Sequence, residues 1–182
     1  MTSQRYGVLG NPIAHSKSPK IHAMFAELCG IDLDYQAYCL DKHNFEGELL
    51  SLVNNGLVGC NVTVPFKENA YRFSTELTIQ AREAGAVNTL KFVGDQVFGQ
   101  NTDGDRLLCD LNERHQLNLS QQRILVLGAG SAAMGILGPL LRANPTEVVI
   151  SNRTFEKAQS LADNFKAVGN SVACEWSRLS GR

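Results

Sequence analysis

The chain has 182 residues and a formal net charge of −1, and hydrophobic residues make up 43% of it. This composition is close to that of ordinary globular proteins and allows a packed core. The balanced charge gives no indication of a nucleic-acid or anionic-membrane partner. No apolar run reaches the ~18 residues that a membrane span needs, and the polar start shows no signal segment. We therefore expect a soluble, cytoplasmic protein.

Five cysteines are scattered along the chain, and no two of them form a Cys-x-x-Cys pair. An odd, scattered set is typical of free thiols in a reducing compartment. The four histidines lack the spacing that is typical of a zinc site. The sequence thus predicts free thiols and no metal site.

The first part of the chain alternates strand-like and helix-like segments, which predicts an α/β fold with a largely parallel sheet. Ser18 and Asp103 are suited to cap the helices that begin at them, because their side-chain oxygens can accept hydrogen bonds from backbone amides. The expected strands are residues 6–9, 35–40, 57–64, 86–93 and 96–100, the last two as a hairpin across Gly94-Asp95. The expected helices are residues 18–29, 44–53, 76–83 and 104–115.

A polar connector at residues 116–122 separates this part from a second α/β segment. We place the domain boundary in the connector, so that the first domain covers residues 1–118 and the second covers residues 119–182. In the second domain we expect strands at residues 123–127, 147–151 and 171–174, a helix that follows the loop at residues 128–133 and ends at residue 141, and a helix at residues 155–165.

A glycine-rich loop joins the first strand of the second domain to its first helix. The pattern Gly128-x-Gly130-x-x-Ala133 in this context is typical of dinucleotide-binding folds. The first glycine makes the tight turn, the second lets a diphosphate approach the backbone, and the small third residue lets helix and strand pack closely. The helix N-terminus supplies amides and a partial positive charge for phosphate. The expected cofactor residues here are Gly128, Ala129, Gly130, Ser131, Ala132 and Ala133.

The end of the next strand bears on the choice of cofactor. NAD-binding proteins usually place a carboxylate there to bind the ribose 2′-hydroxyl, whereas a nearby Arg suits a 2′-phosphate. This chain has Asn152, Arg153 and Thr154 at that point, and Lys157 adds positive charge one helical turn later. The pattern favours NADP over NAD, with a solvated basic helix start as the alternative interpretation.

Three segments of the first domain closely resemble the shikimate dehydrogenase family. They are GNPIAHSKSP at residues 10–19, NVTVPFK at residues 61–67, and GAVNT at residues 85–89 together with NTDG at residues 101–104. With the glycine loop and the Asn-Arg-Thr segment, the resemblance covers about residues 6–170 in the family's order. It implies an N-terminal, mainly parallel α/β substrate domain followed by the first half of a Rossmann-type NADP-binding domain. It also implies reduction of 3-dehydroshikimate to shikimate with NADPH, a step in chorismate and aromatic amino-acid biosynthesis.

The resemblance also implies roles for individual residues. A hydride that reduces a ketone leaves negative charge on oxygen, and a lysine ammonium is a suitable proton donor for it. On the family's pattern, Lys67 and Asp103 match the catalytic pair, Ser16 and Ser18 match the serines that hold the substrate carboxylate, and Thr63 and Asn88 match residues that bind the ring hydroxyls.

The sequence departs from the family in places. Ser131 stands where members usually have Gly, Met134 where Arg is common, and Asp105-Arg106 where a small or apolar pair is usual. The family's chains also continue into a second half of the cofactor domain. We therefore expect residues 124–127 to form an exposed sheet edge, through which chains could dimerise or aggregate. Two alternatives stay open: an inactive or weakly active truncated remnant, and a paralogue that acts on quinate.

Overall fold

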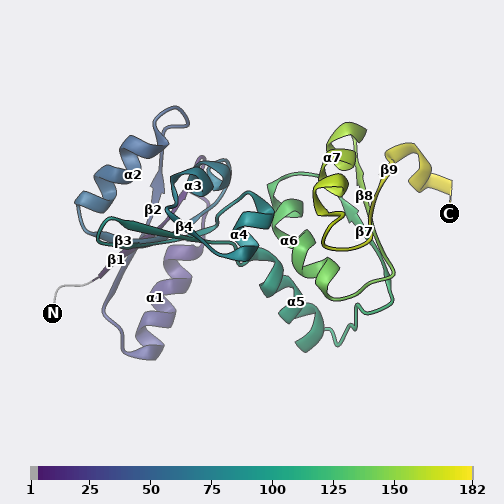
Figure 1. Ribbon diagram of the computed structural model, residues 1–182. Coiled ribbons are helices and arrows are strands. Elements are labelled where there is room, and N and C mark those ends of the chain that lie inside the picture. Colours follow the sequence, from purple (N-terminus) through teal and green to yellow (C-terminus); the bar gives the residue numbers. More distant parts are fainter. Residues whose placement is uncertain (1–3, 182) are drawn as a thin grey trace. The chain divides into compact units, whose positions relative to one another are not determined.

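The computed structural model describes residues 4–181, which divide by their packing into two compact units (Figure 1). The first unit comprises the residues up to 81 and residues 86–100. The second comprises residues 82–85 and the chain from residue 101 onward. The change in composition instead places a boundary between residues 118 and 119, and that functional boundary stays a prediction.

A six-stranded mixed sheet forms the centre of the first unit, with the strand order β2-β1-β3-β5-β6-β4. Strand β1 is parallel to β2 and β3, and β4 is parallel to β6, whereas β5 is antiparallel to both of its neighbours. Helices α2 and α3 lie on one face of this sheet and α1 lies on the other (Figure 1). In chain order the elements are β1 (Gln4–Gly10), α1 (Ser18–Cys29), β2 (Leu33–Cys39), α2 (Phe45–Asn54), β3 (Leu57–Val62), α3 (Lys67–Phe73), β4 (Glu76–Leu77), α4 (Ile79–Ala84, shared with the second unit), β5 (Thr89–Val93) and β6 (Gln96–Gln100).

The core of the first unit lies between the sheet and helices α2 and α3. Leu9 from β1, Leu49 from α2 and Leu90 from β5 are buried there together with Phe66. Burial of such side chains stabilises the fold by about 1.5–3 kcal/mol each. This packing fixes the positions of strands β1 and β3, and it therefore also fixes where the loops after these strands begin.

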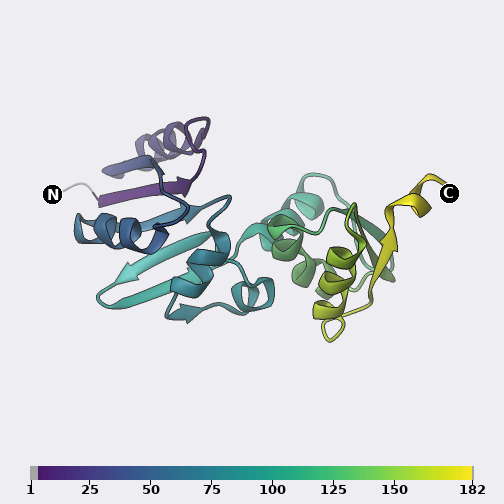
Figure 2. The same ribbon diagram turned by 90° about the horizontal axis from the view of Figure 1, so that it is seen from above.

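A three-stranded parallel sheet forms the second unit, with the order β7-β8-β9. Figure 2 shows helices α6 and α7 on one side of these strands. Leu137, Val148, Ile150 and Leu161 are buried between the helices and the sheet. The elements are α5 (Asp103–Glu113), β7 (Arg123–Leu127), α6 (Ser131–Arg142), β8 (Glu147–Asn152), α7 (Phe155–Phe165), β9 (Ser171–Glu175) and a final 3-10 helix (Trp176–Gly181).

Strand β7 is an edge strand among the described residues, because its one hydrogen-bonded neighbour there is β8. Leu125 and Leu127 on this strand are 50% and 60% exposed. This agrees with the edge expected at residues 124–127. Dimerisation or aggregation through that edge stays a prediction.

Several local expectations were wrong. Helix α1 has Lys17 as its N-cap, and α5 has Thr102, so Ser18 and Asp103 are the first residues of their helices. The helix expected at residues 76–83 begins only at Ile79, because Glu76 and Leu77 pair with β6. Helix α3 was not expected at all. The hairpin expected across Gly94-Asp95 is confirmed, since β5 and β6 run antiparallel there, and it makes the first sheet mixed.

Candidate active site

Three loops of the first unit converge at one edge of its sheet, the edge formed by the carboxyl ends of β1 and β3. They follow β1, follow β3, and precede β5, which runs antiparallel to β3 and therefore starts where β3 ends. Backbone hydrogen bonds tie them together: Thr63 N donates to Leu9 O at 2.9 Å, and Val62 N donates to Asn88 O at 2.8 Å. Asn11 N also donates to Val64 O at 3.1 Å. The carboxyl ends of parallel strands are the usual position of ligand sites in α/β folds.

The loop after β1 carries the two serines and leads into α1. Ser16 Oγ accepts a hydrogen bond from Ser18 N at 3.3 Å, and Ser16 N donates to Ile13 O at 2.9 Å. Both hydroxyls therefore lie at the N-terminus of α1, where backbone amides and the helix dipole favour an anion. The structure thus brings together hydroxyls and a positive helix end, which is a suitable arrangement for a carboxylate.

The loop after β3 carries Thr63 and leads into α3, whose first residue is Lys67. Phe66 is almost fully buried in the core, which anchors the start of this helix. Lys67 O accepts a hydrogen bond from Val87 N at 2.9 Å, so the lysine backbone is tied to the segment before β5. The Lys67 side chain is half-buried. A weak signal for α3 was present in the sequence, namely Phe66, Ala70 and Phe73 at helical spacing.

Asn88 lies immediately before β5 and is 9% exposed. Its backbone is fixed on both sides, since Asn88 N donates to Gln100 O and Asn88 O accepts from Val62 N. Its side-chain oxygen accepts from the Thr89 hydroxyl at 2.9 Å. Thr89 in turn accepts from Asn61 Nδ2 at 3.3 Å. Sequence reasoning did not single out Asn61 or Thr89, although Asn61 begins the Asn-Val-Thr-Val-Pro motif.

Asp103 belongs to the second unit, in the first turn of α5. Its backbone amide donates to Oδ1 of Asn101 at 3.1 Å, and Asn101 is itself 1% exposed. Helix α6 approaches this turn closely, because a Cβ at Gly135 would lie 3.1 Å from Asp103 Oδ2. Glycine at that position leaves room for the carboxylate. Of the residues expected to act on substrate, Ser16, Ser18, Thr63, Lys67 and Asn88 gather in the first unit, and Asp103 is in the second.

The glycine loop has the strand–turn–helix geometry that the sequence predicts. Gly128 has φ +110, a backbone conformation that favours glycine, and its amide donates to Ser151 O at 2.7 Å. Gly130 is the N-cap of α6, and open space surrounds the position of a Cβ there. Ala133 is buried against the sheet, as expected for the small third residue. Ser131, Ala132 and Ala133 lie in the first turn of α6, with Ala129 before them, so their backbone amides are at a helix N-terminus, a suitable arrangement for a phosphate group.

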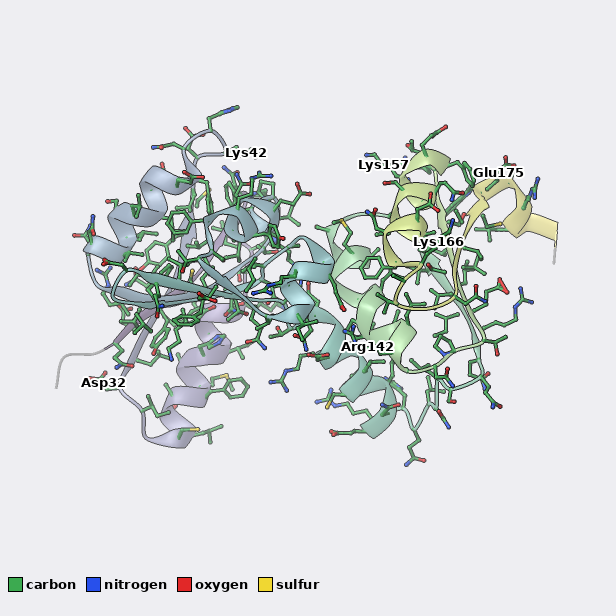
Figure 3. All side chains as sticks on the ribbon, viewed as in Figure 1. Asp32, Lys42, Arg142, Lys157, Lys166 and Glu175 are labelled. Atoms are coloured by element: carbon green, nitrogen blue, oxygen red, sulfur yellow. The ribbon has the colours of Figure 1, made fainter. Side chains whose placement is uncertain are left out.

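The residues expected at the 2′-phosphate begin at Asn152, the last residue of β8, and continue into α7. Asn152 Nδ2 donates to Thr154 O at 2.9 Å, which shapes the turn into α7. Thr154 is the N-cap of α7, and Arg153 is exposed beside it. Lys157 projects from the first turn of α7, as labelled in Figure 3. Arg153 and Lys157 thus place two cations near one helix N-terminus, a suitable arrangement for a phosphate group.

Metal-binding clusters and membrane-spanning helices are other features that the described residues, 4–181, could contain. No group of three or more His, Cys, Asp or Glu side chains in this range could hold a metal ion. No helix in the same range combines the length and the apolar character that crossing a membrane requires.

Comparison with known proteins identifies the family. The model for the shikimate dehydrogenase substrate binding domain matches residues 8–90, and the model for shikimate / quinate 5-dehydrogenase matches residues 110–180. A solved shikimate 5-dehydrogenase from Thermus thermophilus is 32% identical, with a TM-score of 0.83 over 96% of this chain and 69% of its own. The chain belongs to the shikimate dehydrogenase family.

Other members of the shikimate dehydrogenase family are similarly close. A shikimate dehydrogenase (NADP(+)) from Vibrio campbellii is 49% identical over 176 residues, which are 96% of this chain and 63% of that protein. A shikimate dehydrogenase solved in complex with NADP+ is 30% identical, with a TM-score of 0.85 over 93% of this chain and 61% of its own. The chain spans 63–66% of the length of the first three curated relatives that it matches.

Proposed function

We propose that this chain provides the substrate-binding unit and the glycine loop of an NADP-dependent shikimate dehydrogenase, which reduces 3-dehydroshikimate to shikimate. The observation that carries the proposal is the convergence of Ser16, Ser18, Thr63, Lys67 and Asn88 on one edge of the first sheet. These residues come from three loops that backbone hydrogen bonds hold together. Family membership by itself would not require this set of side chains to be complete.

The substrate site is assigned by the chemistry of these groups. Ser16 and Ser18 at the start of α1 are proposed to bind the carboxylate, since hydroxyls and a helix N-terminus both favour an anion. Thr63 and Asn88 are proposed to bind the ring hydroxyls. The relative from Thermus thermophilus was solved in complex with shikimate, which supports this choice of substrate.

Lys67 is the proposed proton donor. When bound, NADPH would supply a hydride to the carbonyl carbon and would itself be oxidised to NADP+. Negative charge then develops on the carbonyl oxygen, and the Lys67 ammonium donates a proton to it, so that the ketone becomes a hydroxyl. A positioned general acid of this kind contributes about 10²–10⁴-fold to the rate. Asp103 is proposed to accept a hydrogen bond from a substrate hydroxyl and so to orient the ring.

The cofactor assignment depends on the second unit. The loop from Gly128 to Ala133 is proposed to bind the diphosphate, and Asn152, Arg153, Thr154 and Lys157 are proposed to bind the 2′-phosphate end of NADP. The relative solved in complex with NADP+ supports this assignment. We place the reaction in the cytoplasm, where cysteine thiols stay reduced.

Quinate is the second candidate substrate. The family model that matches residues 110–180 is described as shikimate / quinate 5-dehydrogenase, which supports an activity on either hydroxy acid. Quinate would use the same carboxylate and hydroxyl contacts, so the choice between the two acids depends on relative affinity and turnover.

One set of assays tests the proposal. Shikimate and quinate are titrated into the chain by calorimetry, and their oxidation is followed as NADPH or NADH formation with each cofactor. We expect shikimate to bind to the chain, and we expect the Ser16→Ala substitution to weaken this binding. Oxidation of shikimate should require NADP+. Binding of shikimate without NADPH formation would support the inactive alternative, and preferential use of quinate would support the paralogue. Absence of binding by either acid would refute the assignment of the site.

A further inference from the structure

A line of polar side chains crosses the first sheet on the face that α1 covers. The Tyr35 hydroxyl on β2 donates to Asn61 Oδ1 on β3 at 2.7 Å. Asn61 Nδ2 donates to the Thr89 hydroxyl on β5 at 3.3 Å, and the Thr89 hydroxyl donates to Asn88 Oδ1 at 2.9 Å. Asn61 and Thr89 are directly opposite each other in the antiparallel β3–β5 pair, so the sheet itself sets their separation.

The length of the first of these bonds indicates its direction. Hydroxyl-to-oxygen hydrogen bonds are typically about 2.7–2.8 Å long and amide-to-oxygen bonds about 2.9–3.0 Å. The 2.7 Å contact therefore fits a phenol that donates to an amide oxygen. The pKa of Tyr35 is raised, mainly by burial and to a smaller extent by the nearby Cys60 side chain. The phenol therefore keeps the proton that it donates. With its oxygen turned to Tyr35, the Asn61 amide donates to the Thr89 hydroxyl, whose own proton is then directed to Asn88 Oδ1.

Helix α1 holds the start of this line. The His22 ring stacks on the Tyr35 ring with centroids 3.9 Å apart and an interplanar angle of 7°. His22 Nδ1 donates to Ser18 O at 2.9 Å, which fixes the orientation of the imidazole. Tyr35, His22 and Asn61 border a hollow of about 580 Å³ on this face. The Tyr35 side chain is thus positioned by the stacked His22 ring and by the hydrogen bond from its hydroxyl to Asn61.

We propose that Tyr35, Asn61 and Thr89 are positioning residues that fix the orientation of the Asn88 amide. The Thr89 donor holds Asn88 Oδ1, so the planar amide turns Nδ2 the other way, as the donor to a substrate hydroxyl oxygen. An asparagine side chain can present either its oxygen or its nitrogen, since the two orientations differ by half a turn. This inference rests on the proposed function, in which Asn88 binds a ring hydroxyl.

Two pairs of variants separate positioning from general structure. Tyr35→Phe and Thr89→Val remove a hydroxyl from the line, whereas Thr89→Ser keeps the hydroxyl. Tyr38→Phe makes the same chemical change on the same strand but on the opposite face, where the Tyr38 hydroxyl is buried and has no hydrogen-bond partner among the described residues. Tyr38→Phe and Thr89→Ser are therefore the matched controls.

The first measurement needs no ligand. In ¹H–¹⁵N spectra of the chain, we expect the two side-chain amide signals of Asn88 to move and broaden in Tyr35→Phe and Thr89→Val. They should stay in place in Tyr38→Phe and Thr89→Ser. Signals that are unchanged in all four variants would overturn the proposal, as would equal changes in variants and controls.

The second measurement is the dissociation constant for shikimate. Loss of one oriented hydrogen bond should weaken binding about fivefold in Tyr35→Phe and Thr89→Val, and Thr89→Ser should restore the wild-type value. Wild-type affinity in Thr89→Val would overturn the inference and leave the proposed function intact. If the wild-type chain binds no shikimate, the proposed function fails, and the line from Tyr35 to Asn88 is then judged by the Asn88 signals alone.

Discussion

Replacement of Gly104 by alanine tests how closely α5 and α6 pack beside Asp103. A Cβ at position 104 would lie 2.5 Å from Pro139 Cγ, 2.8 Å from Gly135 O and 3.1 Å from Ile136 Cα. The last two are backbone atoms of α6 and the first belongs to a rigid ring. None of them can move aside as a flexible side chain would, so the two helices must separate.

The sign of the effect follows from two opposing contributions. Alanine in place of glycine within a helix normally stabilises by roughly 0.5–1 kcal/mol, whereas overpacking typically costs about 1–3 kcal/mol. We expect the clash to prevail and Gly104→Ala to lower the free energy of unfolding by about 1–2 kcal/mol. Gly138→Ala in α6 is the matched control, because the three atoms nearest to its Cβ would be the ends of the flexible Glu83 and Arg142 side chains.

The assay is urea unfolding of the chain, followed by fluorescence of Trp176, the single tryptophan, which belongs to the second unit. The Gly104→Ala midpoint should fall with little change in slope, and the Gly138→Ala midpoint should stay close to wild type. If Gly104→Ala is as stable as the wild type, or more stable, this result would contradict the close packing of α5 against α6 at Gly104.

Three further predictions concern the two sites and the thiols. Lys67→Ala should lower turnover by about 10²–10⁴-fold while leaving shikimate affinity nearly unchanged; unchanged kcat would remove Lys67 from the mechanism. Arg153→Ala should weaken NADP+ binding at least about tenfold, since a charged hydrogen bond contributes about 1.5–3 kcal/mol; an equal loss of NAD+ binding would show that Arg153 does not contact the 2′-phosphate. Burial raises the pKa of the Cys60 thiol, so little thiolate forms at mildly alkaline pH, and an alkylating reagent should label the exposed Cys29 and Cys39 well before it. Equal labelling of all three thiols in the native chain would contradict this burial.

Segments whose hydrophobic pattern is local were predicted well from the sequence. Strand β7 (Arg123–Leu127) and helix α7 (Phe155–Phe165) have the expected bounds. The dense apolar run of β7 and the helical periodicity of α7 lie within the segments themselves and do not depend on distant contacts. Strand β4 (Glu76–Leu77) was missed because it depends on pairing with β6, a contact between segments distant in sequence. Helix α3 begins with the polar residues Lys67 and Glu68, and its local pattern is weak because the helix is anchored by the burial of Phe66 in a core that distant segments complete.

The candidate site was predictable only in part. The motifs predicted Ser16, Thr63, Lys67 and Asn88 as site residues, and the three loops that carry them do converge. Their assigned roles stay predictions. The line from Tyr35 to Asn88 could not be predicted, because it joins side chains from different strands through contacts that depend on strand order.

The most direct test of the central claim is to map where shikimate binds, by following backbone amide signals of the chain during a titration. The account predicts the largest shifts at residues 16–18, 63–64, 66–67 and 88, with one common dissociation constant, and their loss in Ser16→Ala. Shifts confined to the hollow beside His22, or no saturable shifts at all, would contradict the assignment of this edge of the sheet as the shikimate site.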